Sequence, residues 1–272
     1  FLNNGFALIY NDVRRFGFFK LYINKNLKEI NFIKKLGPEP FSKKFDLNYI
    51  FLINYSPLRT SGGVRMKGVV FLGDRQLEIQ QFDDPVPGPS EVILEIKASG
   101  MCGSDLKFYR ASAKDGGTSA LGLGGDGGPV IAGHEPCGVI ADVGPGVTEA
   151  EARIGQRVMD HHYSGCGVCN DCRSGWSQLC GEGFTVFGAT GNGAHAKYMK
   201  VPVRTLVPLP DELSFETGAA ISCGTGTAFG ALRRIGLRGE DTLAVFGQGP
   251  VGLSAVQLAA AMGSRVIALD VS

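Results

Sequence analysis

Residues 242–270 read TLAVFGQGPVGLSAVQLAAAMGSRVIALD, and this stretch decides the fold of the C-terminal part of the chain. The apolar run Thr242–Phe246 predicts a strand, and three glycines follow it within residues 247–252. Val251–Met262 predicts a helix, and Arg265–Asp270 predicts a second strand. The order strand, glycine turn, helix, strand describes one βαβ unit, which predicts the opening of a doubly wound parallel sheet.

The residues before this unit differ in texture. Two helical patterns, Phe215–Ile221 and Gly226–Arg234, follow Pro210. Between Met66 and Pro210, short strands alternate with Gly/Pro turns, which predicts a β-barrel-like domain. The clearest strands are Val69–Leu72, Glu91–Lys97, Val139–Val143 and Arg157–Asp160. We therefore expect one domain over residues 66–210 and a partial α/β domain over residues 211–272.

Four cysteines within fifteen residues form the most specific motif, at positions 166, 169, 172 and 180. Two Cys-x-x-Cys steps let a short loop wrap a tetrahedral ion, and thiolates favour Zn²⁺. The alternative is a disulfide-bonded or reduced, metal-free loop. Four thiolates fill the coordination sphere, so we expect a structural zinc ion at Cys166, Cys169, Cys172 and Cys180.

A second metal site is indicated by Cys102, His134 and Cys223. Two cysteines and one histidine leave a tetrahedral position open, as in catalytic zinc sites, where the ion lowers the pKa of a bound alcohol. Ser104 is expected to carry the hydroxyl proton away, and Asp105 to accept a hydrogen bond from His134 and fix its tautomer. A lone Cys or His is more often a packed core residue, and spacing alone cannot bring Cys223 to Cys102.

The glycine turn predicts a cofactor site because it follows a strand and opens a helix. Glycines at these positions permit close approach of the backbone to a pyrophosphate at the helix N-terminus. Asp270 ends the next strand, where a carboxylate accepts the ribose hydroxyls and repels a 2′-phosphate, which favours NAD over NADP. A turn without a ligand is the alternative. The expected cofactor-binding residues are Gly247, Gly249, Pro250, Val251, Gly252 and Asp270.

Residues 66–272 resemble the medium-chain zinc-dependent alcohol dehydrogenase family. The motifs that carry the resemblance occur in family order: G-x-C-G-S-D at 100–105, G-H-E at 133–135, the cysteines at 166–180, S-C-G at 222–224 and G-Q-G-P-V-G at 247–252. The resemblance implies a GroES-like barrel domain followed by a Rossmann domain. It also implies catalytic zinc on Cys102, His134 and Cys223, with Glu135 as an occasional ligand, and two zinc ions per chain. The implied activity is hydride transfer between a small alcohol or carbonyl substrate and NAD.

One position departs from the family pattern. Lys107 stands where several relatives have a His at the outer end of the proton relay, and a Lys is a poor shuttle near neutral pH. His161 and His162 are alternative relay groups, but we interpret them as solvated loop histidines.

The front of the chain differs in composition. Residues 1–60 contain 10 Lys/Arg and 4 Asp/Glu, a net charge of +6, whereas the remainder has a net charge of −5. Strands are expected at 6–10 and 16–23, and a helix at 27–36. Residues 6–51 resemble an internal fragment of the formamidopyrimidine-DNA glycosylases, through the motifs at 10–17 and 36–42. This resemblance implies that Arg14 and Phe16 contact DNA in a catalytically incompetent segment, so the alternative function is DNA binding by residues 1–60.

Composition limits the remaining choices. The chain has 272 residues, 44% of them hydrophobic and 19% charged, with a net charge of +1, which is typical of a soluble globular protein. The sequence contains no apolar run of about eighteen residues, the length that would predict a membrane span, and no signal-peptide pattern. We therefore expect a cytoplasmic protein. We further expect residues 1–60 to be a foreign fragment joined to an enzyme that starts at Met66, the cofactor domain to be incomplete, and the isolated chain to turn over poorly. The full-length enzyme is expected to form a homo-oligomer.

Overall fold

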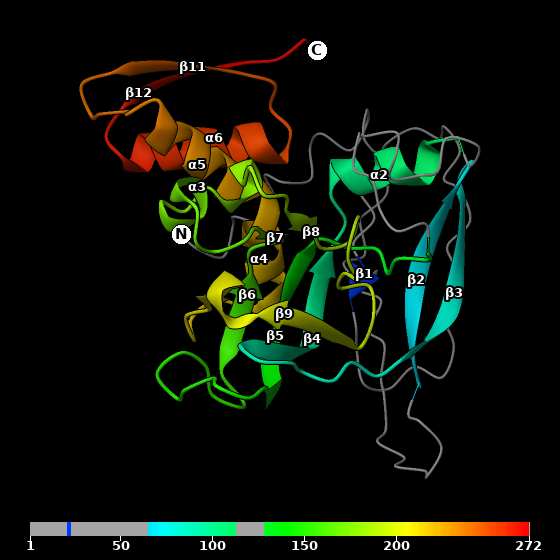
Figure 1. The fold of residues 1–272 in the computed structure, drawn as a ribbon. Coiled ribbons are helices and arrows are strands. Elements are labelled where there is room, and N and C mark those ends of the chain that lie inside the picture. Colours follow the sequence, from blue (N-terminus) through cyan, green and yellow to red (C-terminus); the bar gives the residue numbers. More distant parts are fainter. Residues whose placement is uncertain (1–20, 23–64, 113–127, 272) are drawn as a thin grey trace.

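The computed structural model describes residues 21–22, 65–112 and 128–271. The expectations for residues 1–60 lie outside the described residues, apart from strand β1 (Leu21–Tyr22), which falls within the strand expected at 16–23. The part of the chain from residue 65 onward has a β-rich half and a smaller helical half (Figure 1).

The β-rich half is built on an antiparallel sheet whose strands differ in length. Its strands follow the order β1, β4, β5, β6, β10, and β9 pairs with the first half of β4. The bounds are β4 (Glu91–Gly100), β5 (Glu135–Val143), β6 (Arg157–Asp160), β9 (Tyr198–Pro202) and β10 (Leu206–Pro208). Apolar side chains of β4, β5 and β9 form its core, among them Leu94, Ile140 and Met199, each at most 1% exposed.

Two smaller sheets complete this half, and the described strands do not form the closed barrel that the sequence predicts. Strands β2 (Arg65–Gly73) and β3 (Gln76–Asp83) pair with each other, as do β7 (Tyr163–Ser164) and β8 (Thr185–Val186). The β2–β3 hairpin meets the rest of the domain through the isolated bridge between Gly68 and Ala196 and through backbone hydrogen bonds of Val69. These contacts do not form a continuous ladder, so the barrel expectation is corrected to an open, multi-sheet arrangement.

Short helices fill the connections of the β-rich half. Helix α2 (Gly103–Arg110) follows β4, and α3 (Asn170–Arg173) and the 3-10 turns η4 (Ser177–Leu179) and η5 (Val203–Thr205) lie further along the chain.

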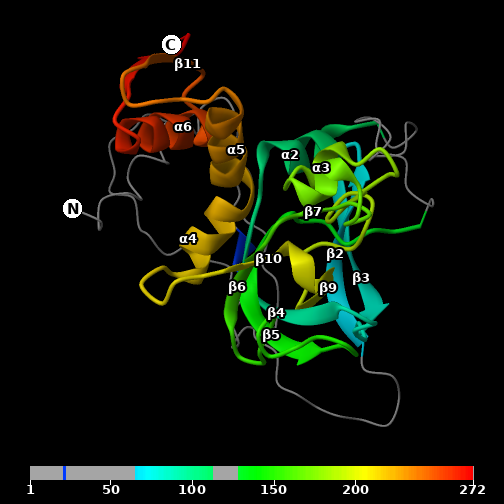
Figure 2. The same ribbon diagram turned by 60° about the vertical axis from the view of Figure 1, so that its left-hand side comes forward.

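A longer helical segment then leads out of the β-rich half. It consists of α4 (Phe215–Ala220), the π-helical turn η6 (Ile221–Thr225) and α5 (Gly226–Arg234), which adjoin without a break. Ser214 begins this segment, because its Oγ accepts a hydrogen bond from the backbone N–H of Thr217. Figure 2 shows the segment running between the main sheet and the C-terminal unit.

The C-terminal unit has the βαβ order that the sequence predicts. Strand β11 (Thr242–Phe246) and strand β12 (Arg265–Leu269) pair in parallel, and α6 (Pro250–Ala261) connects them. Apolar side chains stay exposed on these strands, such as Phe246 at 81%. In the described ranges, 21–22, 65–112 and 128–271, none of the helices has the length and apolar character needed to cross a membrane.

One buried carboxyl group, that of Asp160, lies in the main sheet. Asp160 ends β6 with 0% exposure, and neither carboxyl oxygen has a hydrogen-bond partner among the described residues. The neighbouring Thr205 hydroxyl donates to the Pro202 carbonyl instead, at 2.8 Å. Burial raises the pKa of Asp160 well above its ordinary value of 3.8.

This pKa shift predicts a pH-dependent stability. The unfolded chain loses the Asp160 proton at a lower pH than the folded chain does, so the folded state loses stability as the pH rises from about 4 through the folded pKa. Asp160→Asn should flatten this slope, because an amide does not ionise. Thermal unfolding midpoints between about pH 4.5 and 8 measure the effect, with the exposed Asp142→Asn as the control. Parallel curves for the parent and Asp160→Asn would contradict the expectation.

Candidate metal sites and cofactor turn

The first site begins where two paired strands end. In the ladder between β4 and β5, Gly100 stands opposite Glu135, so Cys102 and His134 are brought to the same end of the sheet. Cys102 is the N-cap of α2, and its backbone N–H donates to Asp105 Oδ2 at 2.7 Å. This capping contact fixes the loop that presents the Cys102 thiol.

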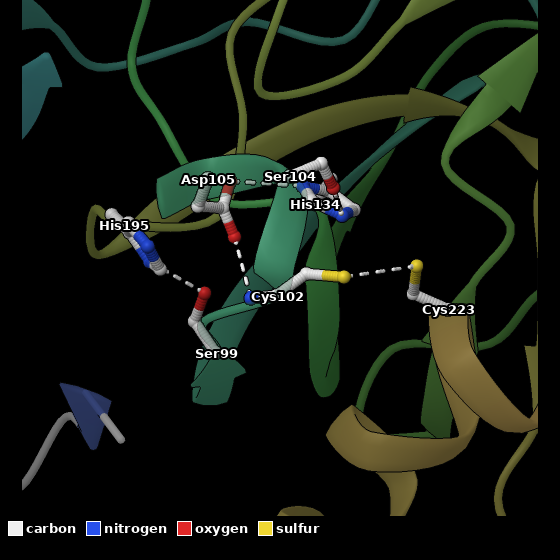
Figure 3. Close-up of polar contacts among 7 residues, drawn as sticks. All are labelled: Ser99, Cys102, Ser104, Asp105, His134, His195 and Cys223. Carbon is white, nitrogen blue, oxygen red and sulfur yellow. Dashed lines mark hydrogen bonds and ion pairs between the residues drawn. The ribbon is translucent and has the colours of Figure 1, made fainter. Parts of the chain in front are cut away.

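Cys223 joins the pair from the π-helical turn η6, across 121 residues of sequence. Its Sγ lies 3.9 Å from Cys102 Sγ, and the ligand atoms of Cys102, His134 and Cys223 all lie within 4.8 Å of one another (Figure 3). Zn–S bonds of about 2.3 Å at a tetrahedral angle place two sulfurs roughly 3.8 Å apart. A disulfide needs about 2.05 Å. The triad of Cys102, His134 and Cys223 therefore fits a metal ion.

The expected contact between Asp105 and His134 is present. His134 Nδ1 donates to Asp105 Oδ1 at 2.9 Å, and both side chains are buried. This bond holds the proton on Nδ1, so the lone pair of Nε2 is available to a metal ion. Ser104 Oγ lies 3.1 Å from His134 Nε2, which places the proposed proton carrier beside the triad.

We expect Asp105→Asn to lower the affinity of the triad for zinc by about 10- to 100-fold. An Asn oxygen can still accept from the Cys102 N–H, but its NH₂ group would then face His134 Nδ1–H, so the imidazole would be driven to the other tautomer. Chelator competition on the purified chain measures the loss. Ser104→Ala, which removes a neighbouring hydroxyl and keeps the tautomer, is the control. Equal affinity for parent and Asp105→Asn would exclude this role.

Electrostatics in the triad favour a cation. The hydrogen bond from Cys223, aided by His134, lowers the pKa of Cys102 to about 2, although burial opposes the shift. The same hydrogen bond, together with burial, raises the pKa of Cys223 far above its ordinary value. The two thiols thus share one proton, and full deprotonation of the pair requires a further positive charge at this place.

Glu135 lies beside the triad and not within it. Gly100 makes room for its carboxylate, since a Cβ at Gly100 would come within 1.9 Å of Glu135 Oε2. Burial, and then the Cys102 charge, raise the pKa of Glu135 well above its ordinary value. Glu135 is therefore a neighbour of the candidate metal site, while the three residues that lie within mutual reach are Cys102, His134 and Cys223.

The interpretation as solvated loop histidines is wrong for His162, which is buried, whereas His161 is half-buried. His162 is 5% exposed, and its ring centroid lies 5.0 Å from that of His134 and 4.3 Å from that of Tyr163. Burial, followed by the His134 charge, lowers the pKa of His162 to about 3, and burial lowers the pKa of His161. Both imidazoles are therefore neutral near pH 7. His162 lies next to His134 of the metal triad, and His161 lies next to His162. By contrast, Lys107 is exposed on α2.

His195 is a buried histidine near the site that the sequence did not reveal. Its Nδ1 is hydrogen-bonded with Ser99 Oγ at 2.8 Å, and burial lowers its pKa to about 4. The ring packs on Gly133, which has φ +93°, and a Cβ there would lie 2.4 Å from His195 Nδ1. Gly133, directly before His134, was the available signal that another group approaches the backbone here.

The four-cysteine clip, defined as residues 165–180, gathers all its thiols. The Sγ atoms lie within 4.8 Å of one another, with 4.0 Å between Cys166 and Cys172 and 3.8 Å between Cys169 and Cys180. All four cysteines are free, which excludes the disulfide alternative and fits the sulfur spacing of a tetrahedral zinc site. Arg204 fixes the entrance of the clip, because its guanidinium donates to Ser164 Oγ at 2.8 Å and to the Gly165 carbonyl at 2.7 Å.

The glycine turn is a tight connection between β11 and α6. Gly247 has φ +87°, and a Cβ at Gly252 would come within 1.8 Å of the Gly247 carbonyl. Gly249 caps α6, and Pro250 occupies its first turn. Asp270 reaches back to this turn, since its Oδ2 accepts from the backbone N–H of Gln248 at 2.7 Å.

Comparison with known proteins agrees with this geometry. The alcohol dehydrogenase GroES-like domain family matches residues 88–211. The uncharacterized zinc-type alcohol dehydrogenase-like protein YphC of Escherichia coli K12 is 39% identical over 204 residues, which are 73% of this chain and 56% of that protein. Residues 88–211 thus match the GroES-like domain of alcohol dehydrogenases, and the chain is similar to zinc-type alcohol dehydrogenases over about half of their length.

Further similar proteins extend the match. An alcohol dehydrogenase of Geobacillus stearothermophilus is 37% identical over 72% of this chain and 55% of its own length. The NAD complex of acetophenone reductase from Geotrichum candidum superposes with a TM-score of 0.66 at 30% identity, covering 76% of this chain and 58% of that one. The cobalt- and zinc-bound alcohol dehydrogenase of Pyrobaculum aerophilum gives a TM-score of 0.62 at 31% identity, covering 75% of this chain and 59% of that one. The chain spans little more than half the length of these dehydrogenases.

Proposed function

We propose that this chain carries the metal sites and the first cofactor-binding unit of an NAD-dependent zinc dehydrogenase. The reaction is hydride transfer between a small alcohol and NAD, or the reverse reduction of a carbonyl compound. The observation that carries the proposal is the meeting of Cys102, His134 and Cys223 from three distant segments, next to the helix that opens at the glycine turn. A Cβ at Gly224, the residue after Cys223, would lie 3.9 Å from side-chain atoms of Pro250 and Val251.

Each residue of the site has a part in this reaction. Cys102, His134 and Cys223 would hold zinc, which when bound polarises the alcohol oxygen and lowers the pKa of the hydroxyl. Asp105 would keep His134 in the required tautomer, and Ser104 would relay the alcohol's hydroxyl proton by accepting it and releasing its own proton. The products are the carbonyl compound, NADH and one proton.

The cofactor would lie on the βαβ unit. Backbone N–H groups at the start of α6 would receive the pyrophosphate, and Gly252 permits the tight turn that precedes them, since a Cβ there would meet the Gly247 carbonyl. Asp270 would accept the ribose hydroxyls, and its position against the Gln248 N–H supports this role.

Asp270→Ser is expected to weaken NADH binding by about 10- to 100-fold, because hydrogen bonds to a charged group contribute about 1.5–3 kcal/mol each. NADPH binding should weaken less or improve, since the repelling carboxylate is gone. Calorimetric titration with both nucleotides measures the change. Asp241→Ser is the matched control, because Asp241 is an exposed carboxylate of the same unit that accepts a hydrogen bond from the backbone N–H of Arg238. An unchanged NADH to NADPH ratio in Asp270→Ser would contradict the assignment.

The proposal as a whole is tested by NAD reduction with a panel of primary and secondary alcohols. We expect zinc-dependent turnover, at a low rate for residues 1–272 taken alone. Turnover that persists after complete removal of metal would refute it. Light scattering on the purified protein tests the expected homo-oligomer.

The alternative function is DNA binding by residues 1–60, and it rests on the motifs at 10–17 and 36–42 and on the +6 net charge of that segment. Duplex affinity that falls steeply with salt would favour it. No affinity for a duplex at low salt would eliminate it.

A further inference from the structure

The clip contains Trp176, which is the single tryptophan of the chain. Its backbone is fixed within the clip, because its N–H donates to the Asp171 carbonyl and its carbonyl accepts from the Leu179 N–H, both at 2.8 Å. The indole ring, however, extends away from the clip toward α5. The Arg234 guanidinium carbon lies 5.2 Å from the ring centroid, and a Cβ at Gly230 would be 3.8 Å from the ring edge.

Arg234 and Gly230 both belong to α5 and are four residues apart, so they lie on one face of that helix. The indole therefore lies along one full turn of α5, with a cation–π contact to Arg234 and its ring edge facing Gly230.

The helix that receives Trp176 also carries a metal ligand. Helix α5 continues without a break from the π-helical turn that holds Cys223. Eleven residues separate Cys223 from Arg234, which is roughly 16 Å along a helix axis. Ala228 and Leu232 bury the inner face of α5, and Thr225 Oγ1 is hydrogen-bonded with Ser254 Oγ of α6 at 3.0 Å. The segment is thus packed so that restraint at one end is transmitted to the other.

We propose that Trp176 is a positioning residue that fixes the Cys223 helix to the four-cysteine clip. A metal ion in the clip orders the loop that carries Trp176, and the ordered indole then restrains α5 and, through it, Cys223. The clip thereby assists the Cys102–His134–Cys223 triad in addition to holding its own loop. The second half of this statement rests on the proposed function, because it requires a metal ion in the triad.

The first experiment is independent of that function. In a Cys102→Ser background, zinc is added to fill the clip, and amide hydrogen exchange is followed in residues 226–234. Zinc should slow exchange by about 2- to 5-fold in the Cys102→Ser background. It should do the same when Trp176→Phe is added to this background, because phenylalanine retains an aromatic ring for Arg234. Exchange should not slow in Trp176→Leu or Arg234→Met. Arg233→Met is the matched control, because Arg233 is the neighbouring guanidinium and lies over Phe229, 6.0 Å from its centroid. Equal slowing in Trp176→Leu and the background would overturn the proposal.

The second experiment measures the effect on the triad. The clip is first filled with zinc, and cobalt(II) is then titrated into the triad of the full chain and followed by its visible absorption. We expect about 2- to 5-fold weaker cobalt binding in Trp176→Leu and Arg234→Met, and unchanged binding in Arg233→Met. Unchanged binding in all three would overturn the link to Cys223. If the parent triad binds no cobalt, the proposed function and the link to the triad both fail, while the exchange experiment still decides whether Trp176 joins the clip to α5.

Discussion

Cys223→Ser is expected to lower the affinity of the triad for zinc by roughly 100- to 1000-fold, and the rate of the proposed hydride transfer by a similar factor. Cys223 Sγ is 3.9 Å from Cys102 Sγ and completes the only cysteine pair at this site among the described residues. A serine hydroxyl is a hard, weakly acidic donor, so the ion would lose a thiolate bond worth several kcal/mol. Competition with a chromophoric chelator gives the affinity directly.

The neighbouring Ser222→Ala is the matched control for this substitution. Ser222 lies in the same π-helical turn, and its hydroxyl donates to the Ala219 carbonyl at 2.8 Å. Its loss perturbs the helix without removing a ligand, so zinc affinity should stay within a few fold of the parent. Similar affinities for Cys223→Ser and the parent would show that Cys223 is not a ligand.

Cys169→Ser is expected to destabilise the clip and lower the thermal unfolding midpoint by roughly 6–12 °C, which corresponds to about 3 kcal/mol. Cys169 Sγ lies 3.8 Å from Cys180 Sγ, and its backbone N–H points to Cys166 Sγ at 3.4 Å, so its removal opens the coordination sphere. Because binding of a structural ion adds to the free energy of folding, its loss appears as instability.

The effect should coincide with that of a chelator. EDTA should lower the midpoint of the parent and have a much smaller further effect on Cys169→Ser. Cys137→Ala is the matched control, since Cys137 is a buried thiol outside both cysteine sets and its variant should keep the full EDTA response. An EDTA response in Cys169→Ser as large as that of the parent would argue against an ion in the clip.

Local signals in the sequence predicted the C-terminal elements well. The bounds of α5 (Gly226–Arg234) and β11 (Thr242–Phe246) are those that periodicity and glycine placement indicate. The clip was also predictable, because its four thiols lie within fifteen residues and short Cys-x-x-Cys steps constrain the loop geometrically.

Features that depend on packing between distant segments were harder to predict. Cys223 reaches Cys102 across 121 residues, and only the family resemblance linked them. His162 was misinterpreted because it packs against His134, which belongs to a distant segment that the local loop sequence does not reveal. The closed barrel was wrong for the same reason, since strand pattern fixes the strands but not whether their edges meet.

We expect the chain to bind two metal ions at two chemically distinct sites. Zinc content by mass spectrometry of the parent, Cys223→Ser, Cys169→Ser and the double variant tests it most directly. The expected contents are about two, one, one and zero ions per chain, with cobalt spectra showing which site is lost in each single variant. A parent that binds a single ion, or single variants that both retain two, would contradict the account.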